Sequence, residues 1–158
     1  MPHVHDLIDF TVSAFILHPT KPRLLLVKHR KIGKWLQPGG HIELDENPLQ
    51  ALTHELEEET GLQPSDYTLL QPDQPTGLTH TTALPVPFQI NQHAFNDTHQ
   101  HIDLSYIAKA HTDTLTETPD GADDIRWCTL AELKDFATSD EIFPDTLHIC
   151  EWVLSKAL

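Results

Sequence analysis

The sequence predicts an α/β fold, an α/β/α sandwich in which a mixed β-sheet lies between helices. Two aliphatic segments, 11–18 and 23–28, have the length and composition of strands. A helical pattern of apolar residues covers 48–60, and a second one begins at Pro144. We expect the sheet to lie between these two helices. The 158 residues fit one domain with a sizeable core, so a single domain over 1–158 is expected.

The first predicted strand reads T-V-S-A-F-I-L-H over 11–18. It is nearly continuous in apolar character from Val12 to Leu17, which is typical of a strand that is buried on both faces. A turn that contains proline, at 19–22, separates it from the second predicted strand at 23–28.

Two consecutive glycines, Gly39 and Gly40, follow an extended piece around Trp35 and precede the helical segment. Residues without a side chain let the backbone approach a ligand closely. The pair therefore indicates a ligand site, with a simple tight turn as the alternative.

The helix predicted at 48–60 has a signal at each end. Asn47 suits the N-cap, and Pro48 suits the first helical position, where its missing N–H costs no hydrogen bond. Gly61 suits the left-handed conformation that often ends a helix. The expected apolar stripe consists of three leucines at three- and four-residue spacing, Leu49, Leu52 and Leu56.

Three glutamates, Glu55, Glu58 and Glu59, share one face of this helix because they are related by three and four residues. Like charges at these spacings repel each other, and the C-terminal end of a helix favours basic side chains. A hard cation such as Mg2+ would neutralise the cluster, since Mg2+ prefers oxygen ligands. The pattern indicates a metal site, with a merely acidic surface as the alternative.

The middle of the chain predicts a loop and then two strands. Residues 63–82 are expected to be mostly loop, because prolines and a glycine interrupt them. An alternating strand follows at 84–90, and its Pro85 and Pro87 indicate an edge position or an irregular start. The apolar residues of this alternation are Leu84, Val86, Phe88 and Ile90.

The second of these strands, at 99–106, has one apolar and one polar face. Its polar face carries His99, His101, Asp103 and Ser105. Two histidines on one strand face can bind a metal, and they can also hydrogen-bond a base or a phosphate. We expect His99 and His101 to contact substrate, with a solvated polar face as the alternative.

The C-terminal part predicts an acidic loop at 112–124, a short strand at 125–128, a short helix at 130–136 and a longer helix from Pro144. The core stripe of the last helix is Leu147, Cys150 and Leu154. Cys128 and Cys150 are expected to be reduced thiols. No apolar run is long enough for a membrane span, and the N-terminus lacks a secretory pattern, so we expect a cytoplasmic protein.

The formal net charge of −14 should repel nucleic-acid polymers and anionic membranes. Six of the ten basic residues nevertheless lie together ahead of the paired glycines. They predict a positive rim that draws in a phosphate tail, with Arg30 and Lys34 in contact with substrate; a solvated strand edge and loop is the alternative. The six residues are Lys21, Arg23, Lys28, Arg30, Lys31 and Lys34.

Residues 40–62 resemble the Nudix box. The box consists of Gly, five residues, Glu, seven residues, Arg-Glu, an aliphatic residue, any residue, Glu-Glu, any residue, Gly and an aliphatic residue. The preceding W-L-Q-P-G-G at 35–40 also resembles the family's entry to the box. His54 departs from the pattern, because the family has Arg there. The matching positions are Gly40, Glu46, Glu55, Leu56, Glu58, Glu59, Gly61 and Leu62.

The resemblance implies a Nudix fold over the whole chain. It also implies Mg2+-dependent hydrolysis, with Mn2+ as a second option, of a nucleoside diphosphate linked to another group. Glu58 and Glu59 would bind metal, Glu55 would bind metal or act as the base, and the carbonyl of Gly40 would join the ligands. Glu46 would assist from outside the ligand set.

Further roles follow from the same resemblance. His54 would orient the catalytic glutamates Glu55 and Glu58, as the family Arg does, and we expect it to do so only when protonated. An extra ligand or base can come from a carboxylate ahead of the strand at 125–128. The candidates for this role are Glu117, Asp123 and Asp124.

Three other functions compete with that of an active enzyme. A Nudix-fold nucleotide-binding module with weakened catalysis would account for His54, because neutral histidine is a weaker clamp than arginine. A structural interaction domain would leave the glutamate face unexplained. The zinc-protease pattern His-Glu-X-X-His is incomplete, since position 58 is Glu. The expected partner is a small nucleotide held by the segments 63–82 and 91–101, and a homodimer is left open.

Overall fold

The computed structural model describes residues 7–116 and 122–156. Its strands form one sheet in the order β3-β2-β1-β7-β5, with β4 paired to β1, β6 to β7 and β8 to β2. The strands are β1 (Ile8–Leu17), β2 (Arg23–His29), β3 (Trp35–Leu36), β4 (Gly39–His41), β5 (Tyr67–Leu69), β6 (Gln89–Asn96), β7 (His99–Ala110) and β8 (Ala122–Thr129). The helices are α1 (Pro48–Thr60), α2 (Leu130–Thr138) and α3 (Pro144–Lys156), with a 3-10 turn at Pro64–Asp66.

The strands β1 and β7 lie side by side and parallel in the middle of the sheet, with Thr11 opposite Asp103. Both β2 and β4 pair with β1 in the antiparallel direction. The sheet is therefore mixed, as predicted. Strand β1 begins earlier than the predicted segment 11–18, because Ile8 already pairs with Gln100.

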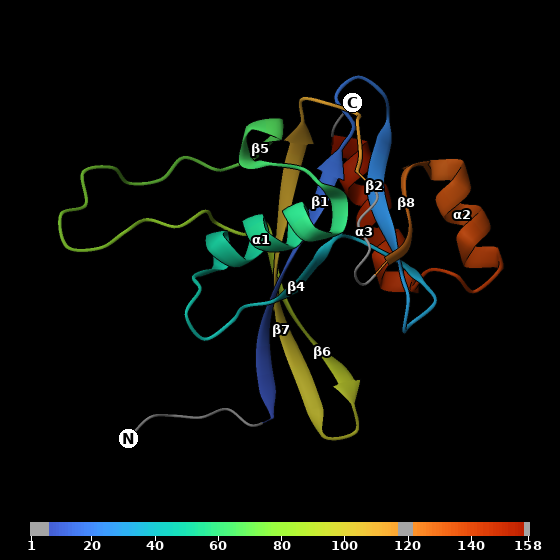
Figure 1. The fold of residues 1–158 in the computed structure, drawn as a ribbon, viewed down its shortest axis with the longest axis horizontal. Coiled ribbons are helices and arrows are strands. Elements are labelled where there is room, and N and C mark those ends of the chain that lie inside the picture. The colour runs from blue at the N-terminus through green and yellow to red at the C-terminus, as the bar shows by residue number, and fades with distance from the viewer. Residues whose placement is uncertain (1–6, 117–121, 157–158) are drawn as a thin grey trace.

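A hydrophobic cluster covers each face of the sheet, since successive residues of β1 point to opposite faces. The first cluster joins Val12 to Leu52 and Leu56 of α1. The second joins Phe15 to Val153 of α3. Figure 1 shows α1 in front of the central strands and α3 behind them. These two layers of helix confirm the α/β/α sandwich.

Helix α1 covers the predicted range, but its buried face differs from the predicted stripe. Leu52 and Leu56 are fully buried, whereas Leu49 is 37% exposed. Leu49 lies in the first turn and belongs to neither hydrophobic cluster. Ala51 and Thr60 are buried in its place.

The prediction of a strand at 84–90 is largely wrong. Regular pairing starts at Gln89, and β6 then continues through Asn96, so most of the predicted contact segment 91–101 is a hairpin of β6 and β7. The prolines at 85 and 87 have no N–H for a strand ladder. Val86, between them, donates its N–H to the side chain of Gln71 at 2.6 Å.

The polar face of β7 is not the solvated face that was weighed as an alternative. His101, Asp103 and Ser105 are all buried. The Asp103 carboxylate accepts hydrogen bonds from the hydroxyls of Thr11 at 2.9 Å and Ser13 at 2.7 Å, and from Ser105 on its own strand. The parallel neighbour β1 thus supplies the donors that let this carboxylate be buried.

The two cysteines, Cys128 and Cys150, are buried free thiols, as expected. Burial raises the pKa of each thiol to about 12, so neither has the thiolate character of a reactive cysteine. None of the helices within 7–116 and 122–156 has both the length and the apolar character needed to cross a membrane.

Replacement of Asp103 by Ala should lower the free energy of unfolding by about 3 kcal/mol, because three buried hydroxyls would lose their acceptor. Urea unfolding followed by circular dichroism measures this change. The control is Asp73→Ala in an exposed stretch, which should shift stability by less than about 0.5 kcal/mol. Equal midpoints for the two variants would contradict a stabilising role for the Asp103 network.

Candidate active site

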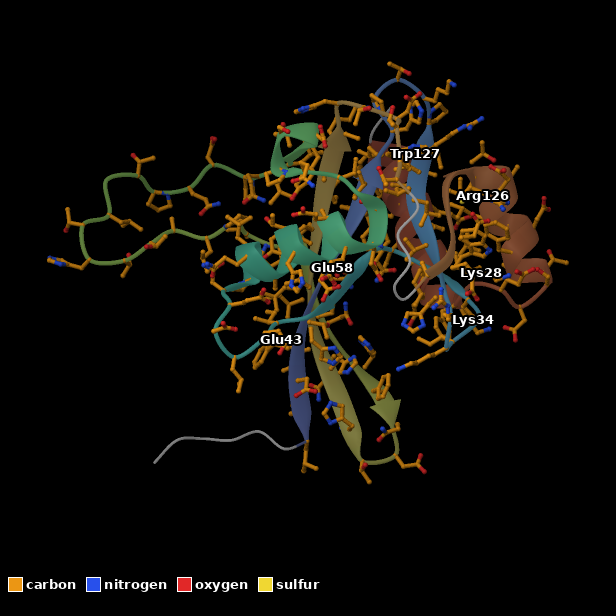
Figure 2. The ribbon with its side chains drawn as sticks, viewed as in Figure 1. Lys28, Lys34, Glu43, Glu58, Arg126 and Trp127 are labelled. Carbon is orange, nitrogen blue, oxygen red and sulfur yellow. The ribbon has the colours of Figure 1, made fainter. Side chains whose placement is uncertain are left out.

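The glutamate face is positioned by a helix with well-defined ends. The side chain of Asn47 accepts hydrogen bonds from the N–H groups of Leu49 and Gln50, and Gln50 reaches back to the N–H of Asn47. At the other end, Gly61 adopts φ 75° and donates its N–H to the carbonyl of Glu57. Both ends were predicted. Figure 2 shows Glu58 on α1, next to the loop that carries Glu43.

Glu59 joins the helix to the paired glycines. Its Oε2 accepts a hydrogen bond from the N–H of Gly39 at 2.9 Å. Burial raises the pKa of the Glu59 carboxyl to about 7, and the neighbouring charges of Glu55 and Glu58 add to this effect. Such a carboxylate is stabilised as an anion when a cation binds it, so Glu59 fits a metal ligand.

Glu55 packs directly against Gly40. A Cβ atom added to Gly40 would lie 2.2 Å from Oε1 of Glu55, which is far closer than any real contact. Only glycine therefore allows the carboxylate this close to the backbone. Burial also raises the pKa of Glu55, followed by smaller effects of nearby charges. Glu55, Glu59 and Gly40 thus form one oxygen-rich place, the kind of donor set that Mg2+ prefers.

His54 lies between two carboxylates. Its Nε2 is 2.8 Å from Oε1 of Glu58, and its Nδ1 is 3.2 Å from Oε1 of Glu46. The hydrogen bond to Glu58 is the main reason that the pKa of His54 is raised, and the charges of Glu58, Glu46 and Glu55 add to it. The imidazolium can therefore hold both side chains at once, which agrees with the orienting role expected for this position.

Three of the six basic residues ahead of the box are paired with carboxylates. Arg30 contacts Asp123 at 2.9 Å, and Lys34 contacts Asp140 at 2.8 Å. Lys28 contacts Glu141 at 2.7 Å. Figure 2 shows Lys28 and Lys34 toward α2, apart from Glu58. The structure thus places Arg30 and Lys34 in pairs with carboxylates, and their contact with substrate stays a prediction.

Two of the three carboxylates predicted as an extra ligand or base are paired with arginines. Asp123 pairs with Arg30, and Asp124 pairs with Nη2 of Arg126 at 2.6 Å. Glu117 lies outside the described residues. An additional ligand or base from this loop therefore also stays a prediction.

A second polar cluster surrounds His101. Oδ2 of Asp9 accepts a hydrogen bond from Nε2 of His99 at 2.6 Å, and the same oxygen is 3.7 Å from Nε2 of His41. Sequence reasoning found His99 and His101 but missed Asp9, His41 and His93. The pairing of β1 with β7 brings in Asp9, that of β6 with β7 brings in His93, and that of β4 with β1 brings in His41. No local pattern reveals those pairings.

A family model described as the NUDIX domain matches residues 9–146. A curated relative, named "Probable DHNTP pyrophosphohydrolase", from Lactococcus lactis subsp. cremoris is 30% identical over 99 residues. The match covers 63% of this chain and 54% of the relative, so the chain spans about half the length of that protein.

Solved structures agree with the family match. A hydrolase of the NUDIX family from Clostridium perfringens has a TM-score of 0.76 and 26% identity, with 95% of this chain and 98% of that chain covered. The NUDIX domain of NrtR from Shewanella oneidensis, in complex with ADP ribose, has a TM-score of 0.68 and 18% identity, with coverage of 97% and 90%.

An Ap4A hydrolase from C. elegans has a TM-score of 0.67 and 14% identity, with coverage of 90% and 93%. The likenesses to NrtR and to the Ap4A hydrolase concern the fold alone, because the identities are low. The family model extends over most of the chain, and it includes every position of the box. The chain belongs to the Nudix family.

Proposed function

We propose that the chain is a Mg2+-dependent pyrophosphohydrolase that cleaves a nucleoside diphosphate linked to another group. The observation that supports this most is the pair of partly buried carboxylates, Glu55 and Glu59, set against the paired glycines with raised pKa values. A fold without a ligand here would gain by replacing them with neutral side chains, since burying charge is costly.

The metal ligands in this proposal are Glu55, Glu58, Glu59 and the carbonyl of Gly40. A bound Mg2+ would offset the charge of the pyrophosphate and lower the pKa of the attacking water. Glu55, which is a metal ligand or the base in this proposal, would accept the proton of that water in the second case, directly or through another water. His54 holds Glu58 in place through the contact at 2.8 Å and thereby acts as a positioning residue.

The substrate class follows from the similar proteins taken together. Their names refer to DHNTP, Ap4A and ADP ribose. A small nucleotide with a pyrophosphate bond is therefore the proposed substrate. The second candidate is a nucleotide-binding module with weakened catalysis, and His54 in place of the family's Arg is the observation that favours it.

A turnover assay separates these two functions. The protein and Mg2+ are incubated with each of DHNTP, Ap4A, ADP ribose and the nucleoside triphosphates. The release of phosphate and pyrophosphate is measured for each compound. Multiple turnovers on at least one substrate are expected. Binding of a nucleotide in calorimetry without any turnover on the panel would favour the binding module instead.

Replacement of Glu58 or Glu59 by Gln should reduce kcat at least about 100-fold, because loss of a metal ligand costs more than loss of a group that only supports one. Circular dichroism should show both variants folded. The matched control is Glu57→Gln, an exposed neighbour on α1, which should retain wild-type turnover. Retained turnover in Glu58→Gln and Glu59→Gln would refute the ligand assignment.

The pH dependence of stability provides a test without substrate. The folded-state pKa of Glu59, about 7, lies above the ordinary glutamate value of 4.5, so the folded protein binds the proton more tightly than the unfolded chain. With a chelator present, stability should fall as the pH rises from 4.5 through 7, by up to about 3 kcal/mol. Thermal unfolding of Glu59→Gln should show a smaller fall, with the remainder due to the raised pKa of Glu55, whereas Glu57→Gln should keep the full fall. Parallel curves for all three proteins would contradict the burial of an ionisable Glu59.

His54→Arg and His54→Ala test the clamp on Glu58. A raised pKa keeps His54 charged to higher pH, but activity should still decline as the pH passes through it. His54→Arg should hold its activity further into the alkaline range, since arginine does not deprotonate. His54→Ala should lose about 10-fold or more in kcat at pH values where His54 of the wild type is protonated, and this difference should shrink at higher pH. The profile of kcat against pH at saturating Mg2+ measures this; superimposable alkaline limbs for wild type and His54→Arg would exclude the charged clamp.

A further inference from the structure

Four imidazole rings and one carboxylate gather around the N-terminal part of β7. They come from four different strands of the sheet. His101 is the central ring, and the ring centroids of its neighbours lie 4.9 to 5.5 Å away. The members of this His101 cluster are Asp9 on β1, His41 on β4, His93 on β6, and His99 and His101 on β7.

His101 is buried, with 7% of its surface exposed, and its Nε2 has no hydrogen-bond partner among the described residues. A buried polar atom without a partner is costly to the fold, so a partner outside the described residues is expected. Burial lowers the pKa of His101, and the imidazoles of His41, His93 and His99 lower it further. The ring is therefore neutral at physiological pH, which is the form that binds a metal.

The ligand atoms of Asp9, His41 and His101 converge. They all lie within 4.8 Å of one another. Ligands of a tetrahedral zinc ion are about 3.3 Å apart, given bond lengths of about 2.0 to 2.1 Å. The side chains of His41 and Asp9 are about half exposed, so small rotations can close the difference.

We infer that Asp9, His41 and His101 form a binding site for a first-row transition-metal ion such as Zn2+. Two imidazoles and a carboxylate suit such an ion, whereas the all-oxygen glutamate site suits Mg2+. His99, 2.6 Å from Oδ2 of Asp9, fixes the orientation of that carboxylate, as groups outside the ligand set commonly do. This inference does not depend on the proposed hydrolysis.

A nucleobase fits the same place less well. Phe95 stacks on His101 with a centroid distance of 4.9 Å and an interplanar angle of 24°. Three further imidazoles are packed edge-on around the ring. A flat base would have to displace one of these rings, whereas a single ion needs only the space between the ligand atoms.

Metal binding to the purified, metal-free chain tests this site. Zn2+ is titrated by calorimetry in excess Mg2+ without nucleotide, and Co2+ is titrated by visible absorption, which reports coordination geometry. The disrupting variants are His41→Gln and Asp9→Asn, both at partly exposed positions where the fold should persist. His148→Gln, an exposed histidine on α3, is the matched control, and Glu58→Gln/Glu59→Gln removes the other site.

We expect one Zn2+ per chain in the wild type, in His148→Gln and in the double glutamine variant. His41→Gln and Asp9→Asn should weaken this binding at least about 10-fold and remove the Co2+ absorption bands. Wild-type affinity in both disrupting variants would overturn the inference. So would the loss of Zn2+ binding in the double glutamine variant, or no Zn2+ binding in the wild type. Because no substrate is present, these outcomes are independent of whether the chain hydrolyses nucleotides.

Discussion

The parallel pairing of β1 with β7 is the constraint on which the rest of the structure depends. Its register sets Thr11 opposite Asp103 and thereby provides the hydroxyl that the buried carboxylate requires. The apolar residues of β1 that alternate with this polar row pack against α1 on one face. On its other edge, β1 pairs with β4 from Thr11 to Ser13, and so it places Gly39 and Gly40 beside the carboxylates of α1.

The electrostatics of the glutamate site oppose the stability of the isolated chain. Burial and like charge raise the pKa values of Glu55 and Glu59, and each raised value represents a cost to the folded state at neutral pH. His54 offsets part of that cost, because it lies between Glu46 and Glu58. In a chain with a net charge of −14, this arrangement leaves the carboxylates in a position to bind a cation.

Local patterns in the sequence were enough to predict α1 and the glutamate face. The caps at Asn47 and Gly61 and the three- and four-residue spacing are properties of short segments, and the structure agrees with them. The strand order was beyond such patterns, because the partners Thr11 and Asp103 are 92 residues apart. For the same reason, a solvated face was weighed for β7, and Asp9 and His41 were missed. The prediction of a strand at 84–90 was wrong because it followed the alternation of apolar residues. Pro85 and Pro87 have no N–H for a strand ladder, and this effect is the stronger one.

Strand β4 connects the two polar clusters, although they differ in chemistry. Gly40 contacts Glu55 of the oxygen-rich site, and the next residue, His41, belongs to the His101 cluster. An ion held by His41, Asp9 and His101 would tie β4 to both β1 and β7, and the backbone of Gly40 would be restrained with it. A change in β4 acts on both clusters, so the three residues of this strand are where occupancy of one site can influence the geometry of the other.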